Sequence, residues 1–290
     1  MEPRPSSVAA NGVEFAYLAA GPTDGPLALC LHGFPDTAHT WRHLLPVLAH
    51  AGYRAVAPWM RGYSPTAVPA DGLYDTGTLA DDANALHAAL GGDERAVLIG
   101  HDWGAAAAYG AGAAAPDRWR RVVAASVPPA GGMGRAFLSF DQLKRSWYMF
   151  YFQSPLAEVV VPLNDMDFIA RLWADWSPGY DAATDVAHVR EALGDGANLT
   201  AALGYYRATF GTSGGGGGGG GGGRGGGRLS QPTAYLHGAD DGCISAEFAE
   251  GARAGLPDGS RVEIVADAGH FLHLEQPETV NALILEFLGS

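Results

Sequence analysis

The segment that decides the fold is Ala96-Val97-Leu98-Ile99-Gly100-His101-Asp102-Trp103-Gly104. Its first four residues are apolar, as expected for a short strand that is buried on both faces. Glycines stand two positions before and two positions after Asp102, which is the spacing of a sharp strand-to-helix turn that exposes its central residue. The alanine-rich run 104–115 predicts the helix that follows. The segment therefore predicts an acidic side chain at the end of a strand and at the start of a helix.

A carboxylate in this place can act as a nucleophile. Serine is the commoner central residue, but here it is Asp102. Backbone N–H groups at a helix N-terminus stabilise negative charge, and a carboxylate can attack a saturated carbon to form an alkyl ester. The segment alone also fits a plain N-cap, because aspartate is a preferred residue there.

Two later residues favour the nucleophile. Asp241 follows the strand-like run 233–236, and His270 follows the strand-like run 261–265. The chain order Asp102, Asp241, His270 is the nucleophile, acid and histidine order of the α/β-hydrolase fold. We therefore predict that His270 is the base and that Asp241 orients it.

Two other places for the acid are weaker. Asp240 competes with Asp241, but the Gly-x-x-Asp spacing from Gly238 favours Asp241. The strand-like run 121–125 is the second place where such folds carry the acid, and no carboxylate follows it closely.

The segment His32-Gly33-Phe34-Pro35 supplies the fourth element, after the apolar run 27–31. In this fold the backbone N–H groups of the loop residue, here Phe34, and of the residue after the nucleophile, Trp103, form an oxyanion hole. We expect Asp102 on a solvent-lined pocket floor. Three further histidines are predicted to be structural hydrogen-bonding residues: His32, His101 and His273.

Strand-like and helix-like runs alternate on both sides of a central region, which predicts an α/β protein with a mostly parallel, doubly wound sheet. The sheet domain should comprise 1–130 and 229–290. Other strands are expected at 13–19 and 53–58, and other helices at 41–51, 79–90 and 279–287.

Residues 131–228 carry paired aromatics on helix-like segments without a strand-like run, which predicts an inserted helical cap. Near its end lies the tract 214–227, which is all glycine except Arg224. Glycine at this density cannot hold one conformation, because each residue would lose maximal backbone entropy. We expect a flexible, expanded loop there.

The composition excludes several functions. The formal net charge of −13 and the single lysine, Lys144, argue against a nucleic-acid partner. The N-terminal residues have no apolar core of a signal peptide, and no run is long enough to span a membrane. The two cysteines, Cys30 and Cys243, are predicted to be buried thiols in a cytoplasmic protein.

With these elements in order, the chain resembles the epoxide hydrolases of the α/β-hydrolase fold. The matching motifs are His32–Pro35, Gly100–Gly104 and Gly269-His270. The segment Ser146–Pro155 is similar to the Y-x-x-x-F-Q-x-P segment of that family, and Gly204–Arg207 is similar to its W-Y-R segment, with tyrosine in place of tryptophan.

The resemblance implies that Tyr148 and Tyr206 bind and protonate the oxygen of a hydrophobic epoxide in an aromatic-lined slot. Asp102 would open the ring, and His270 would activate the water that hydrolyses the resulting ester. The product would be a vicinal diol. No metal and no organic cofactor is implied.

Three alternatives remain at this point. Haloalkane dehalogenases share the aspartate nucleophile and hold the halide with the tryptophan after it, here Trp103, but their usual second donor is missing at Phe34. Fluoroacetate dehalogenases place arginines after the nucleophile, where this chain has Ala105–Ala108. A third alternative is a ligand-binding homologue without activity, although a binding protein does not need a base directed at Asp102.

Overall fold

The computed structural model describes residues 2–129, 134, 136–211, 228–249 and 251–289. An eight-stranded sheet has the order β1-β2-β4-β3-β5-β6-β7-β8. Strands β3 to β8 are parallel, and β1 and β2 are added antiparallel at one edge. The strands are β1 Arg4–Ala10, β2 Val13–Ala20, β3 Leu27–Leu31, β4 Arg54–Pro58, β5 Val97–His101, β6 Arg121–Ala125, β7 Thr233–Gly238 and β8 Arg261–Val265.

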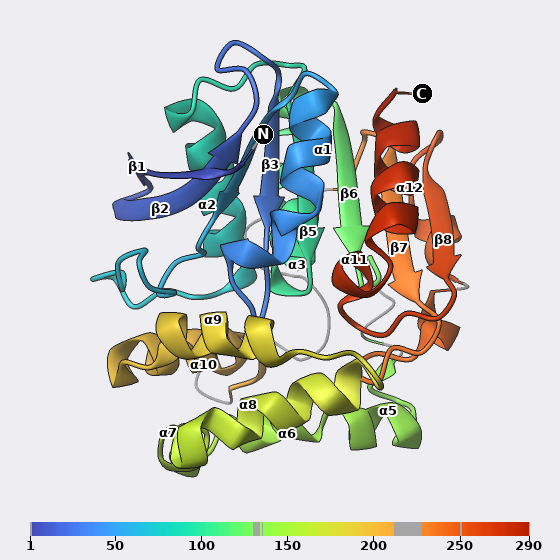
Figure 1. Ribbon diagram of the computed structural model, residues 1–290. Helices are drawn as coiled ribbons and strands as arrows, with labels where there is room; N and C mark the ends of the chain where they lie inside the picture. The colour runs from blue at the N-terminus through green and yellow to red at the C-terminus, as the bar shows by residue number, and fades with distance from the viewer. Residues whose placement is uncertain (1, 130–133, 135, 212–227, 250, 290) are drawn as a thin grey trace.

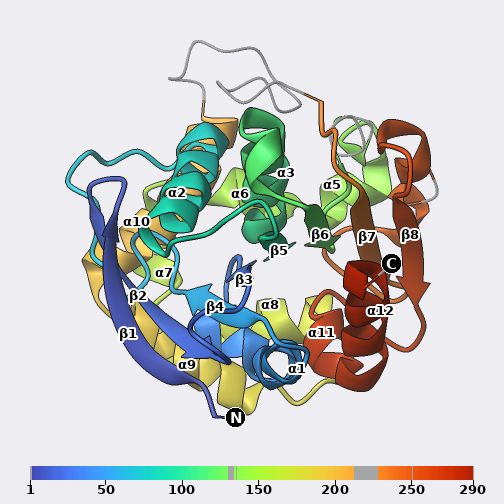
Figure 2. The ribbon, with the colours of Figure 1, turned by 90° about the horizontal axis from the view of Figure 1, so that it is seen from above.

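Helices cover both faces of the sheet, so the predicted doubly wound α/β fold is confirmed. Figure 2 shows α2 and α3 on one face and α1, α11 and α12 on the other. Strands β3 and β5 are buried along their whole length, as expected for central parallel strands. These helices are α1 Leu44–His50, α2 Thr76–Ala89, α3 Trp103–Ala114, α11 Leu272–Glu275 and α12 Pro277–Gly289.

A layer of helices between β6 and β7 lies across the carboxyl ends of the parallel strands (Figure 1). This is where the sequence predicts the cap, whose boundaries at 131 and 228 stay a prediction. The predicted flexible tract 214–227 lies outside the described residues. The helices of the layer are α5 Phe140–Arg145, α6 Trp147–Tyr151, α7 Leu156–Val160, α8 Leu163–Trp176, α9 Ala183–Leu193 and α10 Gly196–Phe210.

Two elements differ from the sequence prediction. The polar N-terminal segment forms β1, which pairs antiparallel with β2 and is largely exposed. As an edge strand it contributes backbone hydrogen bonds rather than core side chains, so it lacks an apolar pattern. The predicted helix 41–51 is divided into a 3₁₀ turn, Ala38–Arg42, and α1. Pro46 lies in the first turn of α1, where its missing N–H costs no hydrogen bond.

None of the helices in the described part of the chain is long and apolar enough to cross a membrane. Cys30 and Cys243 are both buried and carry free thiols, 0% exposed.

A buried ion pair ties the loop after β4 to the helices around it. The guanidinium of Arg61 donates two hydrogen bonds to the carboxylate of Asp82 in α2, at 2.5 and 2.6 Å. The backbone carbonyl of Arg61 accepts a hydrogen bond from Tyr205 in α10, at 2.9 Å. The side chain of Arg61 is completely buried, and its second carboxylate partner, Asp71 at 3.3 Å, is 44% exposed, so buried Asp82 is its main counter-charge.

We predict that Asp82→Asn lowers the free energy of unfolding by about 3 kcal/mol, because it leaves a buried guanidinium with only the longer, partly exposed contact to Asp71 as counter-charge. Denaturant unfolding monitored by circular dichroism measures this change. The matched control is Asp93→Asn, which breaks the exposed pair with Arg95 and should have little effect. Equal stability losses in the two variants would contradict the role of the buried pair.

Candidate active site

Asp102 lies at the sharp turn between β5 and α3. Its backbone is in a left-handed conformation, with φ 53° and ψ −119°, which is strained for a residue with a side chain. The two flanking glycines make the turn possible. A Cβ on Gly100 would overlap the carbonyl of Gly104, and a Cβ on Gly104 would overlap the carbonyl of Leu31. The strained turn directs the carboxylate away from the sheet.

The loop after β3 reaches one oxygen of this carboxylate. The backbone N–H of Phe34 donates to Asp102 Oδ1 at 2.8 Å. A Cβ on Gly33 would overlap the same oxygen, so only glycine fits there. Trp103 is the first residue of α3, and its N–H has no acceptor within the helix. Of the two N–H groups predicted for the oxyanion hole, that of Phe34 thus binds the carboxylate of Asp102, and that of Trp103 is not used within the helix.

The imidazole of His270 lies between two carboxylates. Its Nε2 is 3.7 Å from Asp102 Oδ2, and its Nδ1 is 2.9 Å from Asp241 Oδ2. The other oxygen of Asp241 accepts the N–H groups of Cys243 and Ile244, at 2.7 and 2.9 Å. Asp240, the competing acid, is exposed. The structure therefore brings Asp241, and not Asp240, to His270.

The two carboxylates determine the charge of His270. Burial alone would lower the pKa of His270, but Asp241 and Asp102 outweigh burial and raise this pKa to about 10. Burial also acts to raise the pKa of Asp241, yet the charge and the hydrogen bond of His270 lower it below its usual value. The two neighbouring carboxylates therefore favour the imidazolium form of His270.

Tyr148 in α6 and Tyr206 in α10 come together from two helices, with ring centroids 5.6 Å apart. The hydroxyl of Tyr148 is 3.3 Å from the Cys243 thiol. The hydroxyl of Tyr206 is buried and has no hydrogen-bond partner in the described part of the chain. Burial raises the pKa of both phenols well above 10, so both stay protonated and can donate.

Aromatic rings close the space around Asp102. Tyr206 packs against Phe34, Trp103 and Phe152, with ring centroids 5.0–5.3 Å apart. Asp102 itself is 6% exposed. The expectation of a solvent-lined pocket floor is therefore wrong, because the rings cover the carboxylate.

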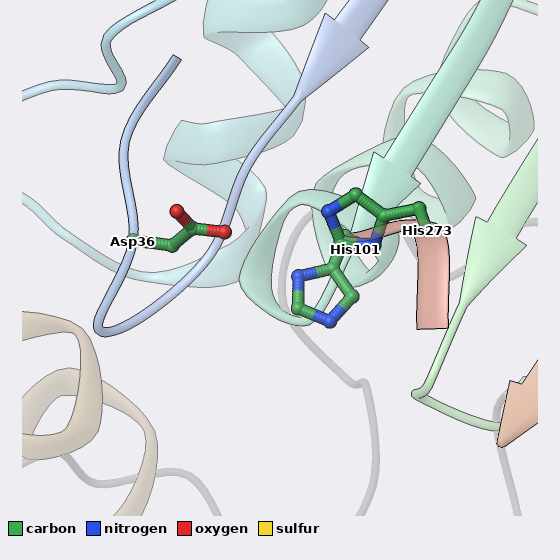
Figure 3. A group of neighbouring side chains, drawn as sticks. All are labelled: Asp36, His101 and His273. Carbon is green, nitrogen blue, oxygen red and sulfur yellow. The ribbon is translucent and has the colours of Figure 1, made fainter. Parts of the chain in front are cut away.

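Three histidines were predicted to be structural. Within the described residues, none of them forms a hydrogen bond with Asp102. His32 accepts the N–H of Met60 at Nε2, 2.9 Å away, and so donates from Nδ1 to the Gly33 carbonyl. His101 and His273 lie with Asp36 in a buried polar cluster, in which one polar atom of each residue lies within 4.8 Å of the others (Figure 3).

The backbone of His270 is held by residues that the sequence analysis overlooked. The His270 carbonyl accepts from the Ser126 hydroxyl at 2.6 Å and lies 2.9 Å from His101 Nε2, which must carry a proton because a carbonyl only accepts. Its N–H donates to the Trp176 carbonyl at 3.0 Å. Ser126 could have been predicted from the sequence, because it directly follows β6, which is the second place where this fold can carry the acid. No sequence pattern indicates the backbone contact of Trp176.

Comparison with known proteins places the chain in a family. The model of the alpha/beta hydrolase fold family matches residues 26–277. An epoxide hydrolase of Caballeronia sordidicola is 30% identical, over 97% of this chain and 92% of that protein. This chain belongs to the epoxide hydrolases of the α/β-hydrolase fold.

Other epoxide hydrolases agree with this assignment. Epoxide hydrolase A of Mycobacterium tuberculosis is 30% identical, over 96% of this chain and 95% of its own length. The crystal structure of the Bacillus megaterium epoxide hydrolase in complex with an inhibitor superposes with a TM-score of 0.84 at 26% identity, covering 98% of this chain and all of that chain. A less specific relative, the AB hydrolase superfamily protein YfhM of Bacillus subtilis, is 32% identical over 96% of this chain and 95% of its own length.

The close approach of Gly33 to Asp102 yields a prediction. Gly33→Ala should lower the rate of turnover at least about 100-fold, because the new methyl group would displace Asp102 from the N–H of Phe34. Far-ultraviolet circular dichroism should stay unchanged. Turnover of an aryl epoxide measures the effect, with Gly255→Ala as a control at the end of the 3₁₀ turn Ala252–Gly255, where a Cβ meets no neighbour and φ is not positive. A fully active Gly33→Ala enzyme would contradict the close approach.

The position of His270 between two carboxylates yields a second prediction. Asp102→Asn should lower the pKa of His270, because one of the two anions that favour the imidazolium is removed. Imidazole resonances followed against pH by NMR measure this pKa, and the exposed His50 ring is the internal control. An unchanged titration of His270 would mean that Asp102 does not interact with it.

Proposed function

We propose that the enzyme converts a small apolar epoxide to a vicinal diol through a covalent ester on Asp102. The observation that carries the proposal is the pair of buried phenols, Tyr148 and Tyr206, that meet close to a carboxylate bordered by backbone N–H groups. A carboxylate alone can displace a good leaving group. An epoxide leaves as an alkoxide, which is a poor leaving group unless a proton donor stabilises it.

In the first step Asp102 Oδ2 attacks a ring carbon of the epoxide. The C–O bond of the ring breaks, and its electron pair passes to the epoxide oxygen, which takes a proton through the hydroxyls of Tyr148 and Tyr206. Oδ2 is the attacking oxygen because Oδ1 is held by the N–H of Phe34. The product is a hydroxyalkyl ester, in which Oδ1 has become the carbonyl oxygen.

Ester formation prepares His270 for the second step. Esterified Asp102 has no charge, so His270 keeps only Asp241 as an anionic neighbour and its pKa falls. The proton that His270 loses balances the proton that the alkoxide gained. Neutral His270 can then take a proton from water at Nε2, as the water attacks Cγ of the ester. The negative charge on Oδ1 is stabilised by the N–H groups of Phe34 and Trp103. The bond between Cγ and Oδ2 then breaks, Oδ2 takes the second proton of the water, and the diol leaves as the carboxylate re-forms with His270 protonated.

A second candidate is dehalogenation, which rests on one observation. The indole Nε1 of Trp103 is buried and has no hydrogen-bond partner in the described part of the chain, so it could hold a leaving halide. A halide leaves as a stable anion and needs only weak donors of this kind. Two protonated phenols are superfluous for that reaction, and for this reason we prefer the epoxide.

The proposal includes a single partner, the epoxide, and no nucleic acid, since the net charge of −13 repels a phosphate backbone. We also propose a cytoplasmic location, supported by the free thiols of Cys30 and Cys243.

Removing the phenol hydroxyls distinguishes the two reactions. Tyr148→Phe and Tyr206→Phe should each slow the single-turnover alkylation of Asp102 by an aryl epoxide by roughly 10- to 1000-fold, judging from the cost of one lost transition-state hydrogen bond. The double variant should nearly abolish it. Quenched-flow mass spectrometry of the Asp102 peptide measures the rate.

The control is Tyr205→Phe, which removes a neighbouring hydroxyl that donates to the Arg61 carbonyl instead. Unchanged alkylation in the double variant would refute epoxide opening by these tyrosines. Halide release from a haloalkane by the wild-type enzyme would then favour dehalogenation.

A further inference from the structure

The side chain of Gln142, in the cap helix α5, is completely buried and hydrogen-bonds to the loop that carries Asp241. We call residues 241–245 the acid loop. Gln142 Nε2 donates to the backbone carbonyl of Cys243 at 2.8 Å, and Gln142 Oε1 accepts the N–H of Ser245 at 3.0 Å. The second N–H of the amide donates to Ser146 Oγ at 3.0 Å. The primary amide thus uses both of its N–H groups and its oxygen.

A second side chain of the same helix holds the start of the acid loop. Arg145 donates to the backbone carbonyl of Asp241 at 2.5 Å. Its partner is a carbonyl and not the Asp241 side chain, so the contact fixes the backbone and leaves the carboxylate free for His270. The side chains of Gln142 and Arg145, one helical turn apart in α5, therefore both bind the acid loop to the cap.

Within the acid loop, Cys243 connects the two halves of the site. Its backbone N–H donates to Asp241 Oδ1 at 2.7 Å, which helps to direct Oδ2 of that carboxylate toward His270. Its thiol is 3.3 Å from the hydroxyl of Tyr148. Its carbonyl is the group that Gln142 holds. A displacement of Cys243 therefore changes both the environment of Asp241 and that of Tyr148.

We propose that Gln142 is a positioning residue, which holds the acid loop against the cap and so directs Asp241 to His270 and Cys243 to Tyr148. The inference rests on the proposed function, because it takes Asp241 and Tyr148 as parts of the reacting site. Gln142 touches neither residue's reacting atoms and acts through the backbone of the acid loop.

The two steps of the reaction should not depend on Gln142 equally. Tyr148 is also held by its own helix and by its ring contacts with Phe152 and Trp176. The backbone of Asp241 is also held by Arg145 and Gly238. The direction of its carboxylate depends more on the acid loop, because both N–H groups that bind Oδ1 belong to that loop. Loss of the Gln142 contacts should therefore impair ester hydrolysis, which needs Asp241 and His270, more than ester formation.

The experiment compares Gln142→Leu with wild-type enzyme in single turnovers with an aryl epoxide. Gln142→Leu keeps an apolar side chain of similar length but makes no hydrogen bond. We expect ester hydrolysis to slow by about 100-fold, the cost of a small misplacement, with a much smaller effect on alkylation, so that alkylated Asp102 accumulates. The matched control is Lys144→Leu, an exposed position of the same helix, which should leave both rate constants unchanged.

Gln142→Glu supplies a signature that a merely structural role would not produce. A neutral carboxylic acid can accept the N–H of Ser245 and donate to the carbonyl of Cys243, whereas an ionised carboxylate cannot donate. Ester hydrolysis by Gln142→Glu, relative to wild type at each pH, should therefore rise as the pH falls. A ratio that does not depend on pH would contradict the proposal, as would equal losses of both steps in Gln142→Leu.

A measurement without substrate separates this proposal from the proposed function. The pKa of His270, followed by NMR, should fall in Gln142→Leu, because a displaced Asp241 stabilises the imidazolium less. An unchanged pKa overturns the positioning role even if the enzyme opens epoxides. A lowered pKa supports it even if the wild-type enzyme forms no ester, in which case only the proposed function fails. The other titratable groups that face His270 among the described residues are Asp102, His101, His237, Cys243, His273 and Glu275.

Discussion

The site depends on one backbone conformation, the left-handed turn at Asp102. This turn points the carboxylate out of the carboxyl edge of the sheet, where Phe34 N–H meets Oδ1 at 2.8 Å and His270 approaches Oδ2. It is tolerated because Gly100 and Gly104 lack the Cβ atoms that would overlap neighbouring backbone. The turn joins the buried strand β5 to α3, and we propose that its strain preorganises the carboxylate of Asp102.

The second organising feature is the charge around His270. Two carboxylates raise its pKa to about 10 in the free enzyme, a value that suits an acid better than a base. The proposed ester removes one of these charges at the moment when a base is needed. The first step would thus convert His270 from imidazolium to base, with Asp241 keeping its orientation. The cap contributes at the same place, because Gln142 and Arg145 hold the loop on which Asp241 lies.

The sequence was most informative where chemistry requires a particular residue at a particular spacing. Such short-range patterns surround Asp102, the residues that follow the later strands, and the tyrosines Tyr148 and Tyr206. Both the fold class and the family that were predicted from these patterns are confirmed. The roles of individual site residues stay predictions. Contacts between distant segments had no such pattern: Gln142 looks like an ordinary polar helix residue until the acid loop is placed beside it. Burial of Asp102 was missed for the same reason, because it depends on how Phe152, just after α6, and Tyr206 of α10 pack against Phe34.

The central claim is that the carboxylate of Asp102 forms a covalent ester with the substrate, and isotope labelling tests it most directly. One turnover of an aryl epoxide with excess enzyme in H₂¹⁸O should give a diol without ¹⁸O, because the new diol oxygen comes from Asp102 Oδ2. The label should instead appear in the peptide that contains Asp102, since water attacks Cγ of the ester. A diol labelled in the first turnover, with an unlabelled Asp102 peptide, would mean that water attacks the epoxide directly and would contradict the account.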